Sequence, residues 1–170
     1  MGRVVYRDGL DVMDFVRVTE MLSQAHWCKG IEIEEVRTCA EKSALVVGAF
    51  DETGRQIGYA RAISDGFRFA YVLDVYVDEG HRKQGIGQGM MRYMLSHPSL
   101  IDVYRWLLIT KDAHEVYKKV GFSPMSRPLD WMEIQKPRPA NRALPAGPAG
   151  PAKAVKVVKT DGGDAPVQTA

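Results

Sequence analysis

The segment from residue 67 to residue 95 constrains the fold most, because it joins a strand pattern to a helix pattern through a glycine-rich turn. Residues 70–77 form an apolar, β-branched run of the kind that fills a buried strand. From Ile86 to Leu95, apolar residues recur at the spacing of one helix face. We therefore expect a strand, a turn and a helix in this order.

The turn carries three glycines at alternate positions, Gly85, Gly87 and Gly89. Each costs roughly 1 kcal/mol against alanine in a helix interior, so some function should offset them. A helix start exposes unpaired N–H groups, and glycine lets the backbone approach a phosphate. Arg82 and Lys83 add positive charge beside the turn. The sequence therefore predicts an anion site, and the alternative is that the glycines only permit close packing of the helix on the sheet.

Two common phosphate-binding patterns are absent from the turn. The dinucleotide fingerprint would need a third glycine where Met90 stands, and the sequence holds no Gly-Lys-Ser or Gly-Lys-Thr of a P-loop. The pattern that is present is Arg82-x-x-Gly85-x-Gly87, shortly after the strand. This pattern resembles the pyrophosphate-binding motif of the GNAT superfamily of acyl-CoA N-acyltransferases.

A second segment, DAHEVYKKVGF at residues 112–122, strengthens the resemblance. The family commonly has A-x-x-L-Y-x-x-x-G-F here. This chain departs from the family at Thr110, where members often carry Asn, and the departure bears on one hydrogen bond to the cofactor. The two segments follow the family's order, and the resemblance covers roughly residues 3–135. The matching residues are Ala113, Val116, Tyr117, Gly121 and Phe122.

The order of predicted elements is β-α-α-β-β-β-α-β-α-β, a mixed α/β chain with hairpins before a β-α-β crossover. It is similar to the GNAT fold, in which helices flank a central splayed sheet. The first predicted helix is capped by Asp11 and has five apolar residues that face inward: Val12, Phe15, Val16, Val18 and Leu22. The other predicted helices are one at residues 33–41, one that starts at Ile86, and one at 112–119 that is capped by Asp112. Predicted strands are 3–6, 44–51, 56–64, 70–77, 104–110, and an extended pair between Phe122 and Ile134.

The composition changes near residue 138. Residues 138–170 contain five prolines, four glycines and eight alanines but no aromatic residue, and such a segment cannot bury a core. We therefore expect an N-acetyltransferase domain over residues 1–137 and a disordered tail over 138–170. The tail holds five Lys or Arg against two Asp, so the rest of the chain has a net charge of about −1 out of a total of +2. That balance does not favour nucleic-acid binding.

The chain carries no pattern of export or membrane insertion. Its start is charged and lacks the apolar stretch of a signal peptide, and the longest apolar run, residues 44–50, is too short to span a bilayer. Cys28 and Cys39 form no CxxC pair and no zinc set with the four histidines. We expect a cytoplasmic protein with reduced thiols, no metal and no membrane partner; a disulfide is the alternative.

The resemblance implies transfer of an acetyl or other short acyl group from acetyl-CoA to a primary amine. In the family, the central strand splays from its neighbour near a bulge and pairs with the pantetheine arm of the cofactor. The residues of this chain that would meet that arm are Val75, Tyr76 and Val77. Those that would bind the pyrophosphate are Arg82, Lys83, Gln84, Gly85, Ile86, Gly87 and Gln88.

Two residues are candidate catalytic groups. The resemblance implies that Tyr117 protonates the leaving thiolate, since a phenol of pKa about 10 can donate to a thiolate whose thiol has a pKa of about 8.5; the alternative is a core tyrosine. Asp74 interrupts the apolar strand, where a charge is costly unless paired or functional. Alternation places it on the face of Val72 and Tyr76, where it would orient the amine or relay its proton through water. The alternative is a structural carboxylate paired with Arg61.

The resemblance also suggests which residues border the acceptor: Trp27, Arg61, Asp65 and Phe69, each with packing or exposure as its alternative. The favoured function is an N-acetyltransferase for a small-molecule amine. The alternatives are a protein or peptide N-acetyltransferase and a non-catalytic acyl-CoA-binding regulatory module. The sequence leaves open the acceptor, the acyl-chain preference, the role of the tail and the oligomeric state, with a homodimer through the C-terminal strand as one option.

Overall fold

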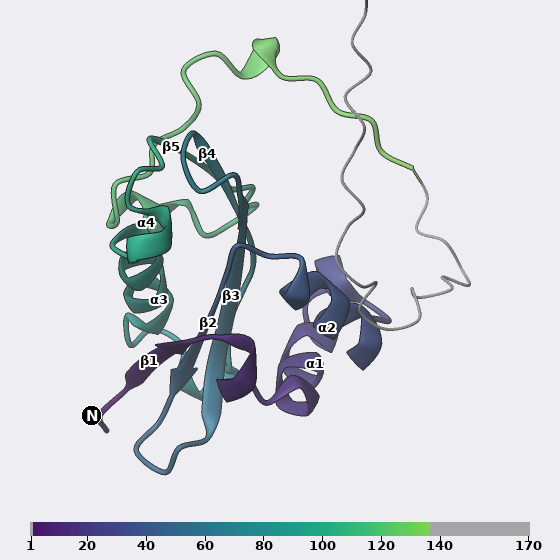
Figure 1. Cartoon of the computed structure of the whole chain (residues 1–170), viewed down its shortest axis with the longest axis vertical. Coiled ribbons are helices and arrows are strands. Elements are labelled where there is room, and N and C mark those ends of the chain that lie inside the picture. The colour runs from purple at the N-terminus through teal and green to yellow at the C-terminus, as the bar shows by residue number, and fades with distance from the viewer. Residues whose placement is uncertain (1, 137–170) are drawn as a thin grey trace, which may run out of the picture. The chain divides into compact units, whose positions relative to one another are not determined.

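The computed structural model describes residues 2–136, and the predicted tail lies outside the described residues. Its strands form one sheet in the order β1-β2-β3-β4-β5, antiparallel except for the parallel pair β4–β5. Helices flank this mixed sheet, which confirms the predicted fold class (Figure 1). The strands are β1 (Val5–Asp8), β2 (Leu45–Phe50), β3 (Gln56–Ser64), β4 (Phe69–Val77) and β5 (Arg105–Leu107).

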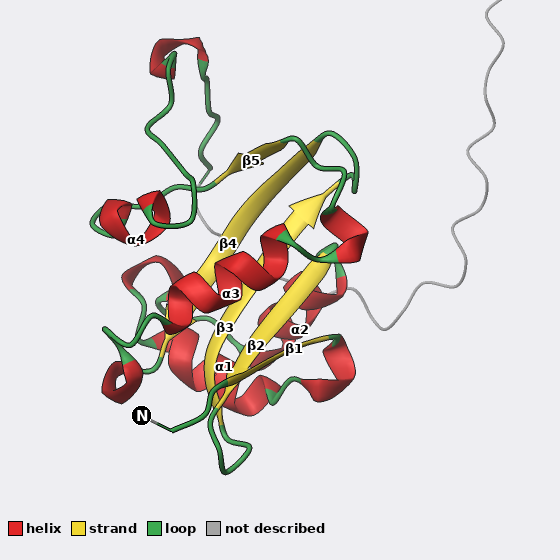
Figure 2. Cartoon of the chain, turned by 90° about the vertical axis from the view of Figure 1, so that its left-hand side faces the viewer, coloured by secondary structure: helices red, strands yellow, loops and turns green. Residues whose placement is uncertain are grey.

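The helices cover both faces of the sheet. Helices α1 (Phe15–Ser23) and α2 (Ile33–Glu41) lie on one face, and α3 (Ile86–Leu95) lies on the other with α4 (His114–Lys118) beside it (Figures 1 and 2). None of the helices within residues 2–136 is long and apolar enough to cross a membrane. Short 3-10 turns are η1 (Leu10–Val12), η2 (His26–Cys28), η3 (Glu79–His81), η4 (Pro98–Leu100) and η5 (Pro128–Asp130).

Two hydrophobic clusters hold these layers together. The first lies between the sheet and α3, where Met90 and Met94 are fully buried against Ile57 of β3. The second lies between the sheet and helices α1 and α2, and it contains Leu22 and Val36. Burial of apolar surface, at about 25 cal/mol per Å², is the main stabilising contribution. The segment from β4 to α3 is therefore fixed by a core on each side of the sheet.

Helix α1 begins later than the sequence predicts. Its cap is Asp14, whose carboxylate accepts a hydrogen bond from the backbone N–H of Arg17 at 3.0 Å, while Asp11 lies in η1. Val16, which was expected to face inward, is 58% exposed. A helix that starts at Phe15 turns Val18 and Leu22 inward, four residues apart, and this spacing leaves Val16 on the solvent side.

The C-terminal part departs furthest from expectation. Strand β5 has three residues instead of the predicted stretch 104–110, and the N-cap of α4 is Ala113 rather than Asp112. The hydroxyl of Thr110 accepts a hydrogen bond from the N–H of Ala113 at 3.0 Å. The strand pair predicted between Phe122 and Ile134 is not formed, since this stretch holds only η5 and residues 123–136 are exposed. A strand requires a neighbouring strand for its hydrogen bonds, whatever its propensity.

Candidate active site

Strand β4 contains a β-bulge. Tyr59 of β3 pairs with Tyr76 and Arg61 pairs with Leu73, so two residues of β4, 74 and 75, lie opposite one residue of β3. Asp74 has a φ of 53°, in the left-handed region that residues other than glycine seldom adopt. The bulge therefore lies at the start of the stretch Val75–Val77 that the family resemblance assigns to the cofactor.

The bulge changes which face of the sheet each side chain meets. Val72 packs in the cluster beneath α3, whereas Tyr76 packs in the cluster beneath α1 and α2. Asp74 contacts Arg61 and Cys28, and Cys28 belongs to the second cluster. The prediction that Asp74 shares a face of the sheet with Tyr76 is confirmed. The prediction that Asp74 also shares that face with Val72 is wrong, because regular alternation does not continue through a bulge.

Strands β4 and β5 separate just before the bulge. Their pairing is confined to residues 69–71 and 105–107. Beyond Tyr71, no strand within residues 2–136 pairs with this edge of β4 (Figure 2). An extended ligand can add to such an edge as an extra strand. The predicted pantetheine site, Val75 to Val77, lies along this open edge, and its role stays a prediction.

Helix α3 starts at the glycine turn after β4. Gly85 is its N-cap with a φ of 79°, and Lys83 also has a positive φ of 62°. No side chain within the described part of the chain caps the helix start. The first N–H groups of α3 are therefore left at the positive end of the helix dipole, where an anion would be favoured. This geometry fits the predicted pyrophosphate site.

A different structural reason explains why glycine stands at each of the three positions in the turn. Gly85 needs its left-handed backbone. A Cβ at Gly87 would meet only Val77, at an ordinary 3.8 Å, so packing does not require glycine there. A Cβ at Gly89 would overlap the hydroxyl of Tyr6 on β1. The packing alternative thus explains Gly89, and it leaves Gly87 to the predicted anion site.

Arg82 is held over the end of β4. Its Nε donates to the carbonyl of Val77 at 3.1 Å, and its guanidinium lies 5.2 Å from the centroid of the Tyr76 ring. Its Nη1 is also 3.2 Å from a carboxylate oxygen of Glu79. Lys83 and Gln84 follow as exposed residues. The turn therefore places positive charge between the open edge of β4 and the start of α3.

Tyr117 lies on α4 and packs against the α3 cluster. Its ring meets that of Phe122 edge to face, with centroids 6.0 Å apart. Burial, with a smaller effect of the Asp112 charge, raises the pKa of Tyr117 above its ordinary value. Within residues 2–136 its hydroxyl forms no hydrogen bond. A phenol that stays protonated and has no partner can donate a proton, and the role of Tyr117 as the acid stays a prediction.

Asp74 forms an ion pair with Arg61, with Oδ2 2.5 Å from Nε and side chains 11% and 13% exposed. Burial would lower the pKa of Arg61, but the neighbouring carboxylate outweighs it and the net shift is upward. Two further groups meet the pair: the hydroxyl of Ser43, 3.4 Å from Nη1 of Arg61, and the thiol of Cys28, 3.7 Å from Oδ1 of Asp74. The paired carboxylate that the sequence left as an alternative is therefore present. An additional role in the reaction stays a prediction for both residues.

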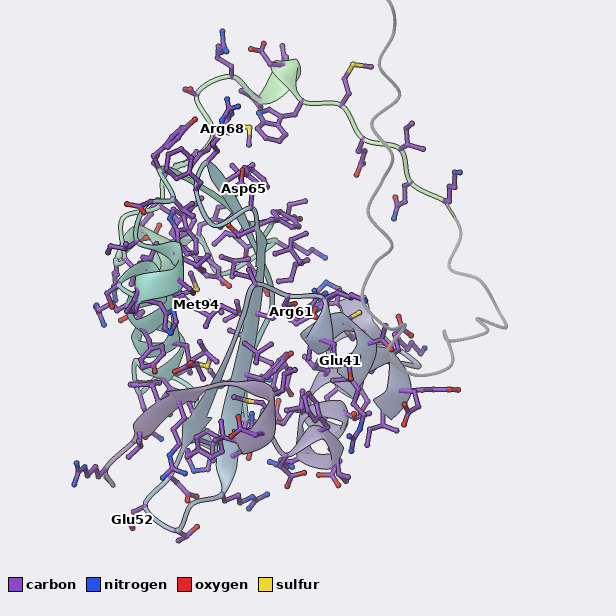
Figure 3. The ribbon with its side chains drawn as sticks, in the orientation of Figure 1. Glu41, Glu52, Arg61, Asp65, Arg68 and Met94 are labelled. Atoms are coloured by element: carbon purple, nitrogen blue, oxygen red, sulfur yellow. The ribbon has the colours of Figure 1, made fainter. Side chains whose placement is uncertain are left out.

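The remaining acceptor candidates do not gather at one point. Trp27 is 53% exposed in η2, next to the Cys28 that contacts Asp74. Asp65 lies in the β3–β4 turn, further along the sheet than Arg61 (Figure 3). Its carboxylate accepts backbone N–H groups of residues 67, 68 and 69, and these hydrogen bonds lower its pKa. The turn itself accounts for Asp65, and Phe69 begins β4 beside it.

One ion pair near the site was missed by the sequence reasoning. Arg17 of α1 places Nη2 2.6 Å from Oδ2 of Asp78, which follows β4 directly. The other oxygen of Asp78 caps η3 by accepting the N–H of Glu79 at 3.1 Å. The pair ties α1 to the turn that leads into α3. An Asp after a strand was a visible signal, but a partner 61 residues away cannot be read from local patterns.

The comparisons with known proteins concern this same region. The sequence matches the model of the acetyltransferase (GNAT) domain over residues 41–124. That range contains the bulge, the glycine turn and Tyr117. None of the curated protein sequences compared with this chain matches it significantly.

Solved structures extend the match to about four fifths of the chain. A Xanthomonas campestris pv. campestris protein assigned to the GNAT family of acetyltransferases is 36% identical, with a TM-score of 0.74 over 81% of this chain and 96% of that chain. A Clostridium acetobutylicum structure, named as an acetyltransferase with acetyl-CoA, is 19% identical, with a TM-score of 0.59 over 78% of this chain and 96% of that chain. The glucosamine-6-phosphate N-acetyltransferase of Arabidopsis thaliana is 17% identical, with a TM-score of 0.56 over 82% of this chain and 99% of that chain.

The last two similarities show the fold alone, and the first shows more. The Xanthomonas protein is covered over nearly its whole length at 36% identity, and the domain model matches the part of the chain that carries the site. This protein therefore belongs to the GNAT family of acetyltransferases.

Proposed function

We propose that this protein transfers the acetyl group of acetyl-CoA directly to the primary amine of a small molecule. The observation that carries the proposal is the order of features along β4 and α3. A bulge at residues 74–75, an open strand edge up to Val77, and a helix start at Gly85 follow one another. Acetyl-CoA has matching parts in matching order: a thioester, an amide-bearing pantetheine arm and a pyrophosphate.

The cofactor side uses backbone groups more than side chains. The stretch from Val75 to Val77 lies along the open edge, where its outward-facing backbone groups can pair with the amides of the pantetheine arm. The N–H groups from Lys83 to Gln88 face the pyrophosphate, and the two cations of the turn add charge-assisted contacts. Acetyl-CoA itself supplies an activated acyl thioester.

The acyl transfer forms a C–N bond, breaks a C–S bond and moves two protons. The N–H groups at the bulge in β4 are suited to stabilise negative charge that develops on the carbonyl oxygen. Tyr117 gives its proton to the leaving thiolate, since a tyrosine phenol is protonated at neutral pH and burial raises the pKa of Tyr117 further. The proton of the amine passes to solvent, either directly or through Asp74.

A small acceptor is favoured over a peptide because the acceptor side of the bulge is covered by the chain. The thiol of Cys28 in η2 lies 3.7 Å from Asp74, so the loop between α1 and α2 closes over this part of β4. Trp27, next to Cys28, is the candidate residue that would border the amine. The Arabidopsis relative of this fold is named for a small amino sugar phosphate.

The experiment begins with a thermal melt in acetyl-CoA, with ATP and NAD as controls. At about 100 times the dissociation constant, acetyl-CoA should add roughly 2.7 kcal/mol of stability, a shift of several degrees. Gly85→Ala should remove the shift. Gly54→Ala is the matched control, because Gly54 also has a left-handed backbone, φ 85°, but lies in the β2–β3 turn. No shift in a protein that melts cooperatively would overturn the proposal.

The second step measures thiol release from acetyl-CoA with a panel of small amines and, in parallel, a peptide library. We expect turnover with at least one small amine. Turnover with peptides and with no small amine would instead establish a protein N-acetyltransferase. Tight acetyl-CoA binding without transfer to any acceptor would point to a non-catalytic acyl-CoA-binding module.

A further inference from the structure

We infer that Arg61 and Asp74 are positioning residues that lock the β4 bulge in the conformation that acetyl-CoA binding requires. The inference rests on the proposed function, because it concerns the same cofactor site. It differs from a role for Asp74 as a base, since the carboxylate would act through the backbone of β4 and not on the amine. Three features of the ion pair carry it.

The first feature is the backbone of Asp74. Its φ of 53° is unfavourable for an L-residue, although Asp tolerates it better than most. A strained conformation of this kind persists only where the surrounding structure fixes it. At this position the fixing contact is the side chain of the same residue, through the 2.5 Å contact of its carboxylate with Arg61.

The second feature is the number of elements that meet at the pair. Arg61 is on β3, paired with Leu73 at the start of the bulge. It reaches Ser43 just after α2, while Asp74 reaches Cys28 in η2. Both charged side chains are nearly nine-tenths buried, so removal of one would leave the other as an unpaired buried charge. The pair is therefore held from three sides and has little freedom to move.

The third feature is what the bulge does to the residues after it. With the bulge, Val75 packs on the α3 side and Tyr76 on the α1 and α2 side. Without it, the register against β3 would slip by one residue and the two side chains would exchange faces. The backbone N–H and C=O groups that point to the open edge would then belong to different residues, because the direction of these groups alternates along a strand. The bulge therefore selects which backbone groups are offered to acetyl-CoA.

The test compares Asp74→Gly with Asp74→Ala and measures the dissociation constant of acetyl-CoA by calorimetry, which needs no acceptor. Both substitutions remove the carboxylate, but only glycine adopts a positive φ without strain. We expect Asp74→Ala to bind about tenfold more weakly than Asp74→Gly, and both more weakly than the unaltered protein. Equal, unchanged affinity in both variants, with a shared loss of turnover, is the result of a base and would overturn the inference.

A second pair of variants covers the case in which Asp74→Ala does not fold. Arg61→Met should weaken acetyl-CoA binding at least fivefold, and Arg61→Lys should recover part of it, because the ammonium keeps the charge opposite Asp74. Hydrogen exchange of the amides from Leu73 to Val77 should be faster in Arg61→Met than in Arg61→Lys. Equal exchange and equal affinity in the two variants would contradict a positioning role.

A general loss of stability has a different signature. Met21→Ala creates a cavity in the cluster beneath α1 and α2, where Met21 is fully buried, and should lower the melting temperature without changing the acetyl-CoA dissociation constant. If the Arg61 variants behaved in the same way, their role would be structural only and the inference would be wrong. Absence of acetyl-CoA binding by the unaltered protein would contradict the proposed function as well, so the two failures are distinguishable.

Discussion

Two apolar regions of this chain have opposite outcomes. The segment from β4 to α3, residues 69–95, lies between two cores, and Met90, Met91 and Met94 are fully buried. The segment 123–136 is also rich in large apolar residues, yet Leu129, Met132 and Ile134 are 95%, 96% and 90% exposed. The sequence predicted ordered strands in both.

The difference shows that a strand pattern needs a partner before it becomes a strand. Strand β4 pairs with β3 from Ala70 to Val77 and has α3 across one face, so one of its edges and its apolar side chains have neighbours. The C-terminal segment meets the sheet through a side chain, with Arg105 stacked 5.1 Å from the Trp131 ring centroid. The neighbours available to the two regions differ, and Pro124 and Pro128 further disfavour a strand in the C-terminal segment because proline cannot donate to a ladder.

The largest expected effect on the free energy of unfolding comes from a Met→Ala substitution in the segment from β4 to α3. The same substitution in the segment 123–136 is the comparison. Met90→Ala should lower the free energy of unfolding by about 2–5 kcal/mol, because it leaves a cavity beneath α3. Met132→Ala should change it by less than about 0.5 kcal/mol, since its side chain is 96% exposed. Urea denaturation measures both. A comparable loss for Met132→Ala would mean that the C-terminal segment is covered in solution, and the contrast between the regions would fail.

Tyr117 sharpens the comparison because it precedes the exposed segment but packs against the core of the other region. Tyr117→Phe should reduce turnover by about 100-fold or more and leave the acetyl-CoA dissociation constant nearly unchanged. Tyr104→Phe, at a 70% exposed position, is the control. Since the acid must be protonated and burial raises its pKa, the midpoint of the alkaline loss of activity should lie above the ordinary tyrosine pKa of about 10. Unchanged turnover in the Phe variant would remove Tyr117 from this role.

The glycines of α3 separate packing from ligand binding within the well-packed region. Gly89→Ala should destabilise the fold by about 1–3 kcal/mol, because its Cβ would collide with Tyr6. Gly87→Ala should stabilise it by about 0.5–1 kcal/mol through lower chain entropy, while it weakens acetyl-CoA binding. Thermal melts with and without acetyl-CoA measure both effects. Equal binding by the Gly87→Ala variant would show that this glycine serves only the helix.

A stabilising effect is expected from removal of a polar atom inside the core. The hydroxyl of Tyr59 is buried and has no hydrogen-bond partner in the described residues, so Tyr59→Phe should raise the free energy of unfolding by about 1 kcal/mol. Burial raises the pKa of Tyr59 well above its unfolded value of about 10.

The unfolded chain therefore loses this proton first, and stability should fall as the pH rises above 10 toward the folded pKa. The Phe variant should lose less stability over that range. A decrease at neutral pH for Tyr59→Phe would mean that the hydroxyl has a partner such as a buried water.

The sequence by itself determined the elements whose signals are local. The bounds of α2 and β3 and the start of α3 agree with the predicted ones, because hydrophobic periodicity and glycine punctuation act over a few neighbouring residues. The two motifs of the family also belong to this level, and they led to the correct fold. Asp74 was visible as a charge in an apolar run, and its pairing with Arg61 was among the predicted alternatives.

The tertiary structure decided what depends on distant neighbours. The bulge reversed the face of Val72 relative to Asp74, Arg17 reached Asp78 across 61 residues, and the predicted C-terminal strands did not form. Each of these outcomes is fixed by contacts between segments that only folding brings together. Local patterns state what a segment can form, and long-range contacts select which of those forms is stable.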